Sequence, residues 1–597
     1  MPCRHSIAVV RALVLAAAVG LPLRASAQVD FSGEWAPRFH EDQPERVPGP
    51  ELGDYLGLPI SDAARLRADS WDASIQTLPE WQCRPHSADY IWRGPSQLTI
   101  RKEENPLTRE ITAFHAEWLR SIDNPVYLDG RPHPSPDALH SWGGFATGKW
   151  EGDMLTITVT HLKEGYIRRN GVPRSNLATV TEHWIRHGDF LTVVTIVNDP
   201  VYLTEPFIRS TDYELDVHQN VPPYPCEMVT EIERPKGVVP HHVPGTNTQV
   251  NEFAQRYDLP FEATRGGAAT SYPDYRKKPA SPSATFTPPA ASARPASGNA
   301  SGEIRITKVR EHLYMLSGAG GNITALVFPE GVTLVDSGRA EMSDKVLAAV
   351  RTLSAKPIRY IINTHVHPDH VGGNEQIGAT GHQITGGNVA GQLADAAEGA
   401  EIIAHENVLE RMTAPSVKPA VPVAMTPGTT YHENHLKLST FYHGDGIELF
   451  YAPSAHTDGD TMVYFRRNDV LVTGDVFSTT SYPVIDVERG GSINGEIAAL
   501  NRILELAFPD FRLEGGTLII PGHGRLCDSA DVAYYRDMVT IIRDRVQDMI
   551  KKGMTLEQVK AARPTRDYDG LYANTSGGST PDTFVESVYK SLTLKKG

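Results

Sequence analysis

The sequence predicts two domains, the first all-β and the second α/β with layered sheets and helices. Three observations support this prediction. All eight tryptophans lie between Trp35 and Trp184, so the two halves differ in composition. A stretch rich in Pro, Ala and Ser, 263–302, separates the halves. After this stretch, apolar strands alternate with helical segments, a pattern that is typical of α/β layers.

Length and charge limit the classes of protein to consider. At 597 residues the chain is too long for a single core. The net charge of −15 and the pI near 5.9 argue against a nucleic-acid-binding surface. We therefore expect a small molecule, and not a nucleic acid, as the partner of this chain.

Residues 1–27 have the features of a signal peptide. Arg4 and Arg11 give a basic start, and an apolar stretch too short to span a membrane follows. Ala25, Ser26 and Ala27 form a typical cleavage site. We expect cleavage before Gln28, export to the periplasm or the medium, and no membrane span in the mature protein. An uncleaved anchor is the alternative.

The first domain is expected at 28–262. Residues 149–160 and 182–197 alternate apolar and polar side chains around Gly-Asp turns, which predicts two β-hairpins. A barrel or a sandwich would bury the tryptophan rings in its core, and a ligand-binding cup with aromatic walls is the alternative. This half resembles only a domain of unknown function found in some exported bacterial proteins, and the resemblance implies no activity.

The segment 263–302 is predicted to be a linker. Its second part is nearly all Ala, Ser, Pro, Thr and Gly, and it cannot bury enough apolar surface to fold. We therefore expect the two domains to be tethered and to move relative to each other.

The cysteines fit an exported protein. Cys83 and Cys226 both lie in the first half, where they can pair in an oxidising compartment, although the sequence leaves the pairing open. Cys527 follows His523 by four residues and is expected to be a semi-buried thiol without a role in the site.

The second domain is expected at 303–553. Runs at 304–309, 313–316, 322–328 and 331–335 predict successive strands, and 344–353 predicts a helix. Further helices are predicted at 495–508 and 530–552. Residues 554–597 are expected to form accessory helices.

The stretch from Asn363 to Asn374, NTHVHPDHVGGN, carries the chemistry of this domain. Three histidines and an aspartate follow a buried strand at 358–363, where α/β layers usually place their active sites. In an extended segment, His365 and His367 point the same way, whereas Pro368 implies a turn that redirects Asp369 and His370. One short loop can therefore serve two neighbouring metal ions.

Three more ligand-type residues follow in order, and each lies at the end of an apolar strand. His456 follows 447–452, Asp475 ends the run 471–475, and His523 ends the run 519–523. This arrangement resembles the metallo-β-lactamase superfamily, whose HxHxDH signature matches 365–370. The resemblance implies an αββα sandwich of two facing sheets with helices outside.

The resemblance also implies the roles of individual residues. His365, His367 and His456 would hold one metal, and Asp369, His370 and His523 a second, with Asp475 bridging the two. Asp336 matches a further aspartate of the family and is expected to support the ligands from outside the first shell.

These ligands suit two zinc ions per chain, with iron or manganese as alternatives. Two ions about 3.5–4 Å apart can share a hydroxide and clamp a substrate, so hydrolysis is the expected reaction. Asp369 is expected to orient the nucleophile, and Tyr482 to act as an oxyanion donor or to serve packing. The expected substrate is a small cyclic amide or ester, with a β-lactam favoured over a lactone or a glyoxalase-type thioester.

Two other classes of function compete with this prediction. Iron-dependent persulfide dioxygenases share the fold that the resemblance implies, but they need only part of the ligand set, which is complete here. A non-catalytic binding protein, acting through the tryptophan-rich half, would be expected to show a degraded set of metal ligands, and none is degraded.

Overall fold

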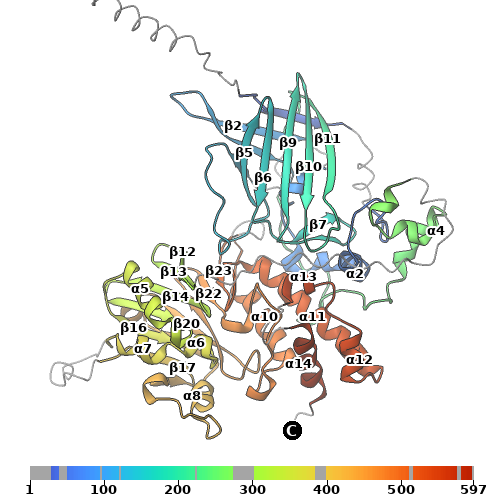
Figure 1. Cartoon of the computed structure of the whole chain (residues 1–597). Helices are drawn as coiled ribbons and strands as arrows, with labels where there is room; N and C mark the ends of the chain where they lie inside the picture. The colour runs from blue at the N-terminus through green and yellow to red at the C-terminus, as the bar shows by residue number, and fades with distance from the viewer. Residues whose placement is uncertain are drawn as a thin grey trace, which may run out of the picture.

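The computed structural model describes residues 28–38, 50–93, 97–119, 123–221, 225–272, 302–383, 398–509, 515–573 and 580–594. The predicted signal peptide and most of the predicted linker lie outside these residues. Figure 1 shows a β-barrel resting on a helical layer, with two further sheets beside that layer. Within the described residues, no helix has the length and apolarity needed to cross a membrane.

Nine strands of the first half close into a barrel in the order β1-β11-β10-β9-β6-β5-β4-β3-β2. Their bounds are β1 (Gly33–Pro37), β2 (Leu98–Glu104), β3 (Ile111–Glu117), β4 (Asn124–Tyr127), β5 (Phe145–Glu151), β6 (Met154–Thr160), β9 (Thr179–His187), β10 (Phe190–Asn198) and β11 (Phe207–Leu215). All neighbours are antiparallel except β4 and β5. A separate pair, β7 (Gly165–Arg168) and β8 (Val172–Arg174), lies outside the barrel sheet.

Alternation of apolar and polar residues places these strands in the barrel wall. In β10 every second residue, from Leu191 to Val197, is buried. Both predicted hairpins are confirmed. The β9–β10 turn contains Gly188 and the β5–β6 turn contains Gly152, and both glycines have a positive φ, which a side chain with a Cβ rarely adopts.

Three of the tryptophans lie in the core of the barrel. Trp35, Trp92 and Trp184 are almost completely buried, and the rings of Trp92 and Trp184 meet edge to face with centroids 5.2 Å apart. Edge-to-face contacts of this kind add to the stabilisation from burial. The core interpretation of the tryptophans is therefore confirmed for these residues.

The prediction that the first half is all-β is wrong in detail. Helical segments occupy the connection between β1 and β2, and more of them follow β11. They are α2 (Asp62–Ser70), η2 (Ala73–Thr77), η3 (Pro79–Trp81), α3 (Ala88–Ile91), η4 (Thr248–Asn251), α4 (Glu252–Arg256), η5 (Phe261–Thr264) and η6 (Ala268–Ser271). Helix α2 begins with the side chain of Ser61 accepting a hydrogen bond from the Ala64 N–H, which is a typical N-cap.

Burial of a carboxyl in the barrel core gives a pH prediction. The indole N–H groups of Trp92 and Trp184 donate to the two carboxyl oxygens of Glu182, each at 2.9 Å. Burial raises the pKa of Glu182 to about 7, despite these two donors. The folded state therefore keeps a proton that the unfolded chain loses near pH 4.5.

Because the folded-state pKa lies above the unfolded one, Glu182 stabilises the fold at low pH, and this stabilisation falls between pH 4.5 and 7. The loss is about 3 kcal/mol, since one pKa unit corresponds to about 1.4 kcal/mol. Glu182→Gln should remove this dependence. Denaturant titration measures the unfolding free energies of the variant and of the wild type. The value for the variant minus the value for the wild type should rise by this amount as the pH increases through this range. A pH-independent difference would contradict the prediction.

A disulfide joins Cys83 to Cys226, which answers the pairing that the sequence left open. The bond closes a separation of 143 residues along the chain. Cys527 is a free, buried thiol that accepts a hydrogen bond from Arg525. It does not belong to either group of candidate metal ligands.

Removal of this disulfide by Cys83→Ser/Cys226→Ser should lower the unfolding free energy by about 2–5 kcal/mol, because the bond restricts a long loop in the unfolded chain. Thermal unfolding followed by tryptophan fluorescence measures the loss. The same denaturation of the wild type with and without a thiol reductant provides the control. An unchanged midpoint in both experiments would contradict the prediction.

Two sheets make up the layered part of the second half. The first has the order β12-β13-β14-β15-β16-β17-β18 and the second β19-β20-β21-β22-β23. Their bounds are β12 (Arg305–Lys308), β13 (Leu313–Ala319), β14 (Gly321–Phe328), β15 (Gly331–Val335), β16 (Ile358–Ile362), β17 (Glu401–His405), β18 (Thr429–Tyr431), β19 (His435–Leu438), β20 (Ile447–Ala452), β21 (Asp460–Phe465), β22 (Val470–Val472) and β23 (Leu518–Ile520). The predicted strands at the start of this half are confirmed.

Both sheets contribute to one apolar cluster, which includes Leu326, Val335 and Ile362 from the first and Leu449 and Ile520 from the second. A second cluster forms where α5 (Ser343–Leu353) and α7 (Asn374–Ala379) pack against the first sheet. The two sheets are thus observed, whereas the full four-layer order stays a prediction.

The remaining helices are α6 (Pro368–Val371), α8 (Glu406–Thr413), α9 (Thr440–His443), α10 (Ile493–Leu506), α11 (Ser529–Lys551), α12 (Leu556–Ala561), α13 (Asp569–Tyr572) and α14 (Pro581–Thr593). The long helix α11 begins with a capping box, in which Asp528 and Asp531 satisfy each other's backbone N–H groups. Helices α10, α11, α12 and α14 pack together into the helical layer below the barrel (Figure 1).

The expectation of two tethered domains is wrong. One apolar cluster contains residues of the barrel and of the helical layer, including Tyr202 and Tyr535. Buried polar contacts cross the same interface: Trp81 Nε1 donates to Asp537 at 2.8 Å, and Lys163 Nζ donates to Asp528 at 2.8 Å. The two halves therefore pack as one body.

The predicted linker also begins too early. Within it, Ala263 and Thr270 are buried, and the Thr270 hydroxyl accepts from the Gly57 N–H at 2.8 Å. The packed part of the first half therefore extends to about Ser271. The low-complexity composition that indicates a linker starts only after this point.

Candidate metal centre

The predicted metal loop leaves the carboxyl end of β16. The strand ends at Ile362, and the loop runs into the short helix α6, which starts at Pro368. Proline suits the first position of a helix because its missing N–H would have no helical partner there. This turn separates His365 and His367 from Asp369 and His370, as the sequence indicated.

The fold brings the seven predicted ligands together in two groups. One consists of His365, His367, His456 and Asp475, and the other of Asp369, His370 and His523. Within each group the ligand atoms lie within 4.8 Å of one another. The structure therefore places all seven residues where the resemblance predicts them, and their binding of a metal stays a prediction.

Asp475 lies between the two groups. Its Oδ2 atom is 3.8 Å from His365 Nε2 and 3.7 Å from His456 Nε2. Its Oδ1 atom is 3.2 Å from His370 Nε2 and 3.3 Å from His523 Nε2. One carboxylate oxygen therefore faces each group, as a bridging ligand requires.

Asp336 supports this arrangement from beneath. Its carboxylate accepts hydrogen bonds from the N–H and the hydroxyl of Thr364, both at 2.8 Å, and contacts His370 Nδ1 at 2.7 Å. With Nδ1 held in this way, the Nε2 atom of His370 is directed toward Asp475. Carboxylate–histidine pairs commonly fix the orientation of metal-binding imidazoles in this manner.

Asp486 supports His367 in a similar way, although no motif in the sequence predicts a role for it. Its Oδ2 atom is 2.9 Å from His367 Nε2, while His367 Nδ1 lies 2.8 Å from His456 Nε2. His367 therefore presents Nδ1 to the centre and Nε2 to its carboxylate partner. The one signal in the sequence is the short separation from Asp475, since a residue that follows a strand end closely can lie at the same edge of the sheet.

Two glycines permit the close packing of the ligands. A Cβ atom on Gly522 would lie 2.1 Å from Asp475 Oδ1, and one on Gly321 would lie 2.5 Å from the His370 ring. Real Cβ atoms do not approach other atoms so closely. Any larger residue at either position would therefore displace a candidate ligand.

The electrostatics of the site prepare the ligands for a cation. Burial would raise the pKa of Asp475, but the nearby His523 and His370 hold it well below its usual range. Burial lowers the pKa of His456 to about 4 and lowers that of His365 well below its usual range. Asp475, His365 and His456 are therefore held as a carboxylate and two neutral imidazoles, which are the protonation states that bind metals. In the second group, burial lowers the pKa of His370 and of His523, but the neighbouring Asp475 raises both above the ordinary value, so metal binding there would displace protons.

A test of fit comes from the buried polar atoms. Among the described residues, His365 Nε2, His370 Nε2 and Asp475 Oδ1 are buried and make no hydrogen bond. Buried polar atoms without partners are costly, and these three face the space between the two groups. Metal ions would satisfy them, so the residues fit a pair of metals.

The expected catalytic role of Tyr482 is contradicted. The side chain is fully buried, and its hydroxyl proton is shared between Asp569 Oδ1, at 2.9 Å, and the Thr565 carbonyl, at 3.1 Å. Its ring stacks on Phe584 with centroids 5.1 Å apart. Tyr482 therefore joins the strand-end loop to the C-terminal helices, which is the packing alternative, and proximity to Asp475 in sequence was misleading.

Comparison with protein families matches residues 317–523 to the model described as "Metallo-beta-lactamase superfamily". The matched range begins in β13 and ends at His523, so it contains all seven candidate ligands. The second half of the chain is therefore similar to this superfamily over the range that carries the candidate ligands. The barrel lies outside the matched range, which agrees with the expectation that the first half is a different kind of domain.

One curated relative is the "Linear primary-alkylsulfatase" of Pseudomonas sp. (strain ATCC 19151), which is 24% identical over 259 residues. The match covers 39% of this chain and 47% of that protein, so the chain spans about half the length of this relative. Among solved structures, a stereoselective inverting sec-alkylsulfatase from Pseudomonas sp. is 19% identical, covers 48% of this chain and 50% of that one, and has a TM-score of 0.35. A metallo-β-lactamase from Pontibacter korlensis is 17% identical, covers 40% and 99%, and has a TM-score of 0.30.

Proposed function

We propose that this chain is a hydrolase with a binuclear metal centre. The observation that carries the proposal is the pair of ligand groups joined by Asp475, with three buried polar atoms facing the space between them. The match of residues 317–523 to the metallo-β-lactamase superfamily model supports it. When bound, two metal ions would activate water as the nucleophile and polarise the substrate.

The protein's own residues would prepare this chemistry. His365, His456, His370 and His523 present Nε2 to the centre and His367 presents Nδ1. Asp336 and Asp486 hold the far nitrogens of His370 and His367, so that both rings keep one orientation. Asp369, whose Oδ2 atom lies 3.5 Å from His523 Nε2, remains the proposed group that orients the nucleophile.

Two substrate classes are proposed. A sulfate ester of an alkyl alcohol is favoured by the name of the curated relative, a linear primary-alkylsulfatase. A small cyclic amide or ester, with a β-lactam first, is the class favoured by the sequence motifs. Lactonase and thioesterase activities belong to this second class.

The test is metal analysis of the full chain, paired with hydrolysis of dodecyl sulfate, nitrocefin and a lactone before and after chelation. We expect about two metal ions per chain and chelator-sensitive hydrolysis of at least one substrate. The substrate that is turned over decides between the two classes. A single iron with oxygen consumption and no hydrolysis would replace the proposal with oxygenase chemistry.

We further propose that the protein is exported. The disulfide between Cys83 and Cys226 supports this proposal, because such bonds persist in oxidising compartments. Expression with the natural N-terminus, followed by fractionation and N-terminal sequencing, tests it. We expect the mature chain to begin at Gln28 and to lie outside the cytoplasm, whereas an intact, cytoplasmic chain would contradict the proposal.

A further inference from the structure

A cavity of about 290 Å³ lies between the base of the barrel and helix α11. Its lining comes from η2, η3, α3 and β7 of the first half and from Tyr534 of α11. None of the seven candidate metal ligands lines it. The volume is near the lower end of that of ligand pockets, and it suits a small organic molecule.

Aromatic rings form the walls of this cavity. The ring of Trp81 lies 5.1 Å from that of Tyr534 and 6.2 Å from that of Tyr166, measured between centroids. His86 stacks on Tyr90, with centroids 4.8 Å apart. Rings that pack against one another in this way leave little freedom to reorient, so the walls are preorganised for a flat apolar body.

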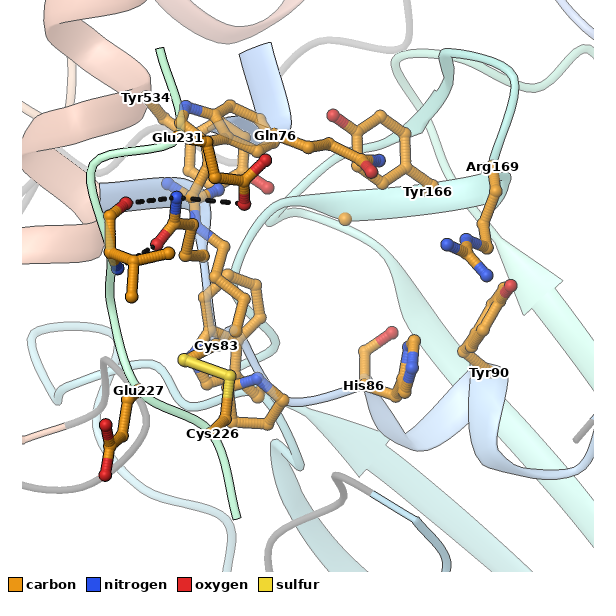
Figure 2. Close-up of a pocket in the computed structure, with 18 residues that line it drawn as sticks. Gln76, Cys83, His86, Tyr90, Tyr166, Arg169, Cys226, Glu227, Glu231 and Tyr534 are labelled. Atoms are coloured by element: carbon orange, nitrogen blue, oxygen red, sulfur yellow. Dashed lines mark hydrogen bonds between the residues drawn. A yellow bond between two sulfur atoms is a disulfide. The ribbon is translucent and has the colours of Figure 1, made fainter. Parts of the chain in front are cut away.

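Two arginines supply positive charge. Arg84 is buried, donates through Nε to the Glu80 carbonyl at 2.8 Å, and lies 3.7 Å above the centre of the Trp81 ring. Arg169 is exposed, and Figure 2 shows it beside Tyr90, across the cavity from the disulfide. A guanidinium inside and another at the mouth favour an anionic group on a ligand.

The acidic residues of the lining, Glu227 and Glu231, lie on the side of the cavity away from Arg169 (Figure 2). Figure 2 shows Glu227 pointing outward, beyond the disulfide and away from the cavity. Glu231 accepts a hydrogen bond from the Gln82 side chain at 3.2 Å, so one of its oxygens is already engaged. Arg169 is therefore the charged group best placed to meet an anionic ligand, and Arg84 adds positive charge deeper in the cavity.

The wall of the cavity that contains Cys226 and Val229 is fixed by contacts at two points. The disulfide ties Cys226 to Cys83, and the Gln82 amide exchanges two hydrogen bonds of 2.8 Å with the backbone of Val229 (Figure 2). Gln82 thus pairs with the wall much as a neighbouring strand would. The cavity is held open by these contacts and does not depend on a ligand for its shape.

We propose that this cavity is a second binding site, separate from the metal centre, for a small organic anion with a flat apolar body. The apolar body would lie among Trp81, Tyr166 and Tyr534. The anionic group, a carboxylate or a sulfonate, would face Arg169 at the mouth and Arg84 inside.

The test is titration of the full chain with naphthalene-2-sulfonate and with 2-naphthoate, followed by calorimetry and by tryptophan fluorescence. The fluorescence reports on the first half, because all eight tryptophans lie there. We expect saturable binding of one molecule per chain, weaker binding of the neutral 2-naphthalenemethanol, and unchanged binding after chelation. The anion that binds more tightly identifies the preferred headgroup.

Matched variants locate the site. Arg169→Glu should weaken binding by about tenfold or more, because it replaces a charged donor by a repelling carboxylate. Gln76→Lys, at an exposed position of the lining, should preserve or strengthen binding. Arg109→Glu makes the same charge change outside the lining and should leave affinity unchanged. Absence of saturable binding, binding lost on chelation, or an unaffected Arg169→Glu variant would overturn the proposal.

Discussion

Asp475→Asn is expected to lower the metal content from about two ions per chain to one or fewer, and to reduce hydrolysis by about 100-fold or more. Asp475 faces both ligand groups, one oxygen to each, and an amide offers neither the charge nor a second oxygen acceptor. Substitutions outside the first shell already cost about 10–100-fold, so a bridging ligand should cost at least as much. Metal analysis measures the first effect, and turnover of whichever test substrate the wild type hydrolyses measures the second.

Two variants make this prediction specific. Asp336→Asn should weaken metal affinity by about 10–100-fold, because His370 loses the carboxylate that orients it. Tyr482→Phe should retain both metals and nearly full turnover per folded chain, since its hydroxyl contacts Thr565 and Asp569 and not the centre. Full metal content and turnover in Asp475→Asn would refute the bridging role.

Lys163→Met is expected to lower the unfolding free energy by about 3–5 kcal/mol. Lys163 and Asp528 are both buried, with side chains 1% and 0% exposed, and their contact joins the barrel to α11. Removal of the cation leaves a buried carboxylate without its charged partner, which is much more costly than loss of an exposed pair. Chemical denaturation measured by tryptophan fluorescence and by far-ultraviolet circular dichroism gives the loss.

Control variants separate burial from charge. Lys163→Met/Asp528→Asn should recover part of the stability, because no unpaired charge remains and the amide oxygen can still cap α11. Lys552→Met breaks an ion pair with Asp548 on an exposed face of the same helix and should cost less than about 1 kcal/mol. Equal losses for Lys163→Met and Lys552→Met would show that the interface pair contributes no more than a surface one.

The same experiment tests whether the two halves unfold together. Tryptophan fluorescence follows the first half and, through Trp81, its contact with α11, whereas circular dichroism follows both halves. Coincident transitions are expected for the wild type, because one apolar cluster spans the interface. Two separated transitions in the wild type would restore the picture of independent domains.

Part of the site was readable from the sequence because its signals are local. His365, His367, Asp369 and His370 lie within six residues of one another, directly after a strand of β-branched and aromatic residues. The hairpins at β5–β6 and β9–β10 were equally local, since each depends on alternation and a glycine turn. The remaining candidate ligands, His456, Asp475 and His523, could be predicted because each follows an apolar strand in the expected order along the chain.

Other features depend on contacts between residues far apart in the chain. Lys163 and Asp528 are separated by 365 residues, and no local pattern marks either as a partner of the other. The cavity has the same origin, because Trp81 and Tyr534 meet only after the barrel docks on α11. Tyr482 illustrates the converse, since closeness to Asp475 in sequence did not bring its hydroxyl to the centre.

The sequence by itself therefore determined the candidate ligands at the strand ends, the likeness of residues 317–523 to a known superfamily and the β-rich character of the first half. These features follow from residue type and spacing. Because side chains alternate between the two faces of a strand, the spacing of residues along the chain predicts which of them lie on the same face. The tertiary structure alone decided the union of the two halves, the support of His367 by Asp486 and the existence of a second cavity. Side-chain burial and pairing across distant segments are set by packing, which no short stretch of sequence encodes.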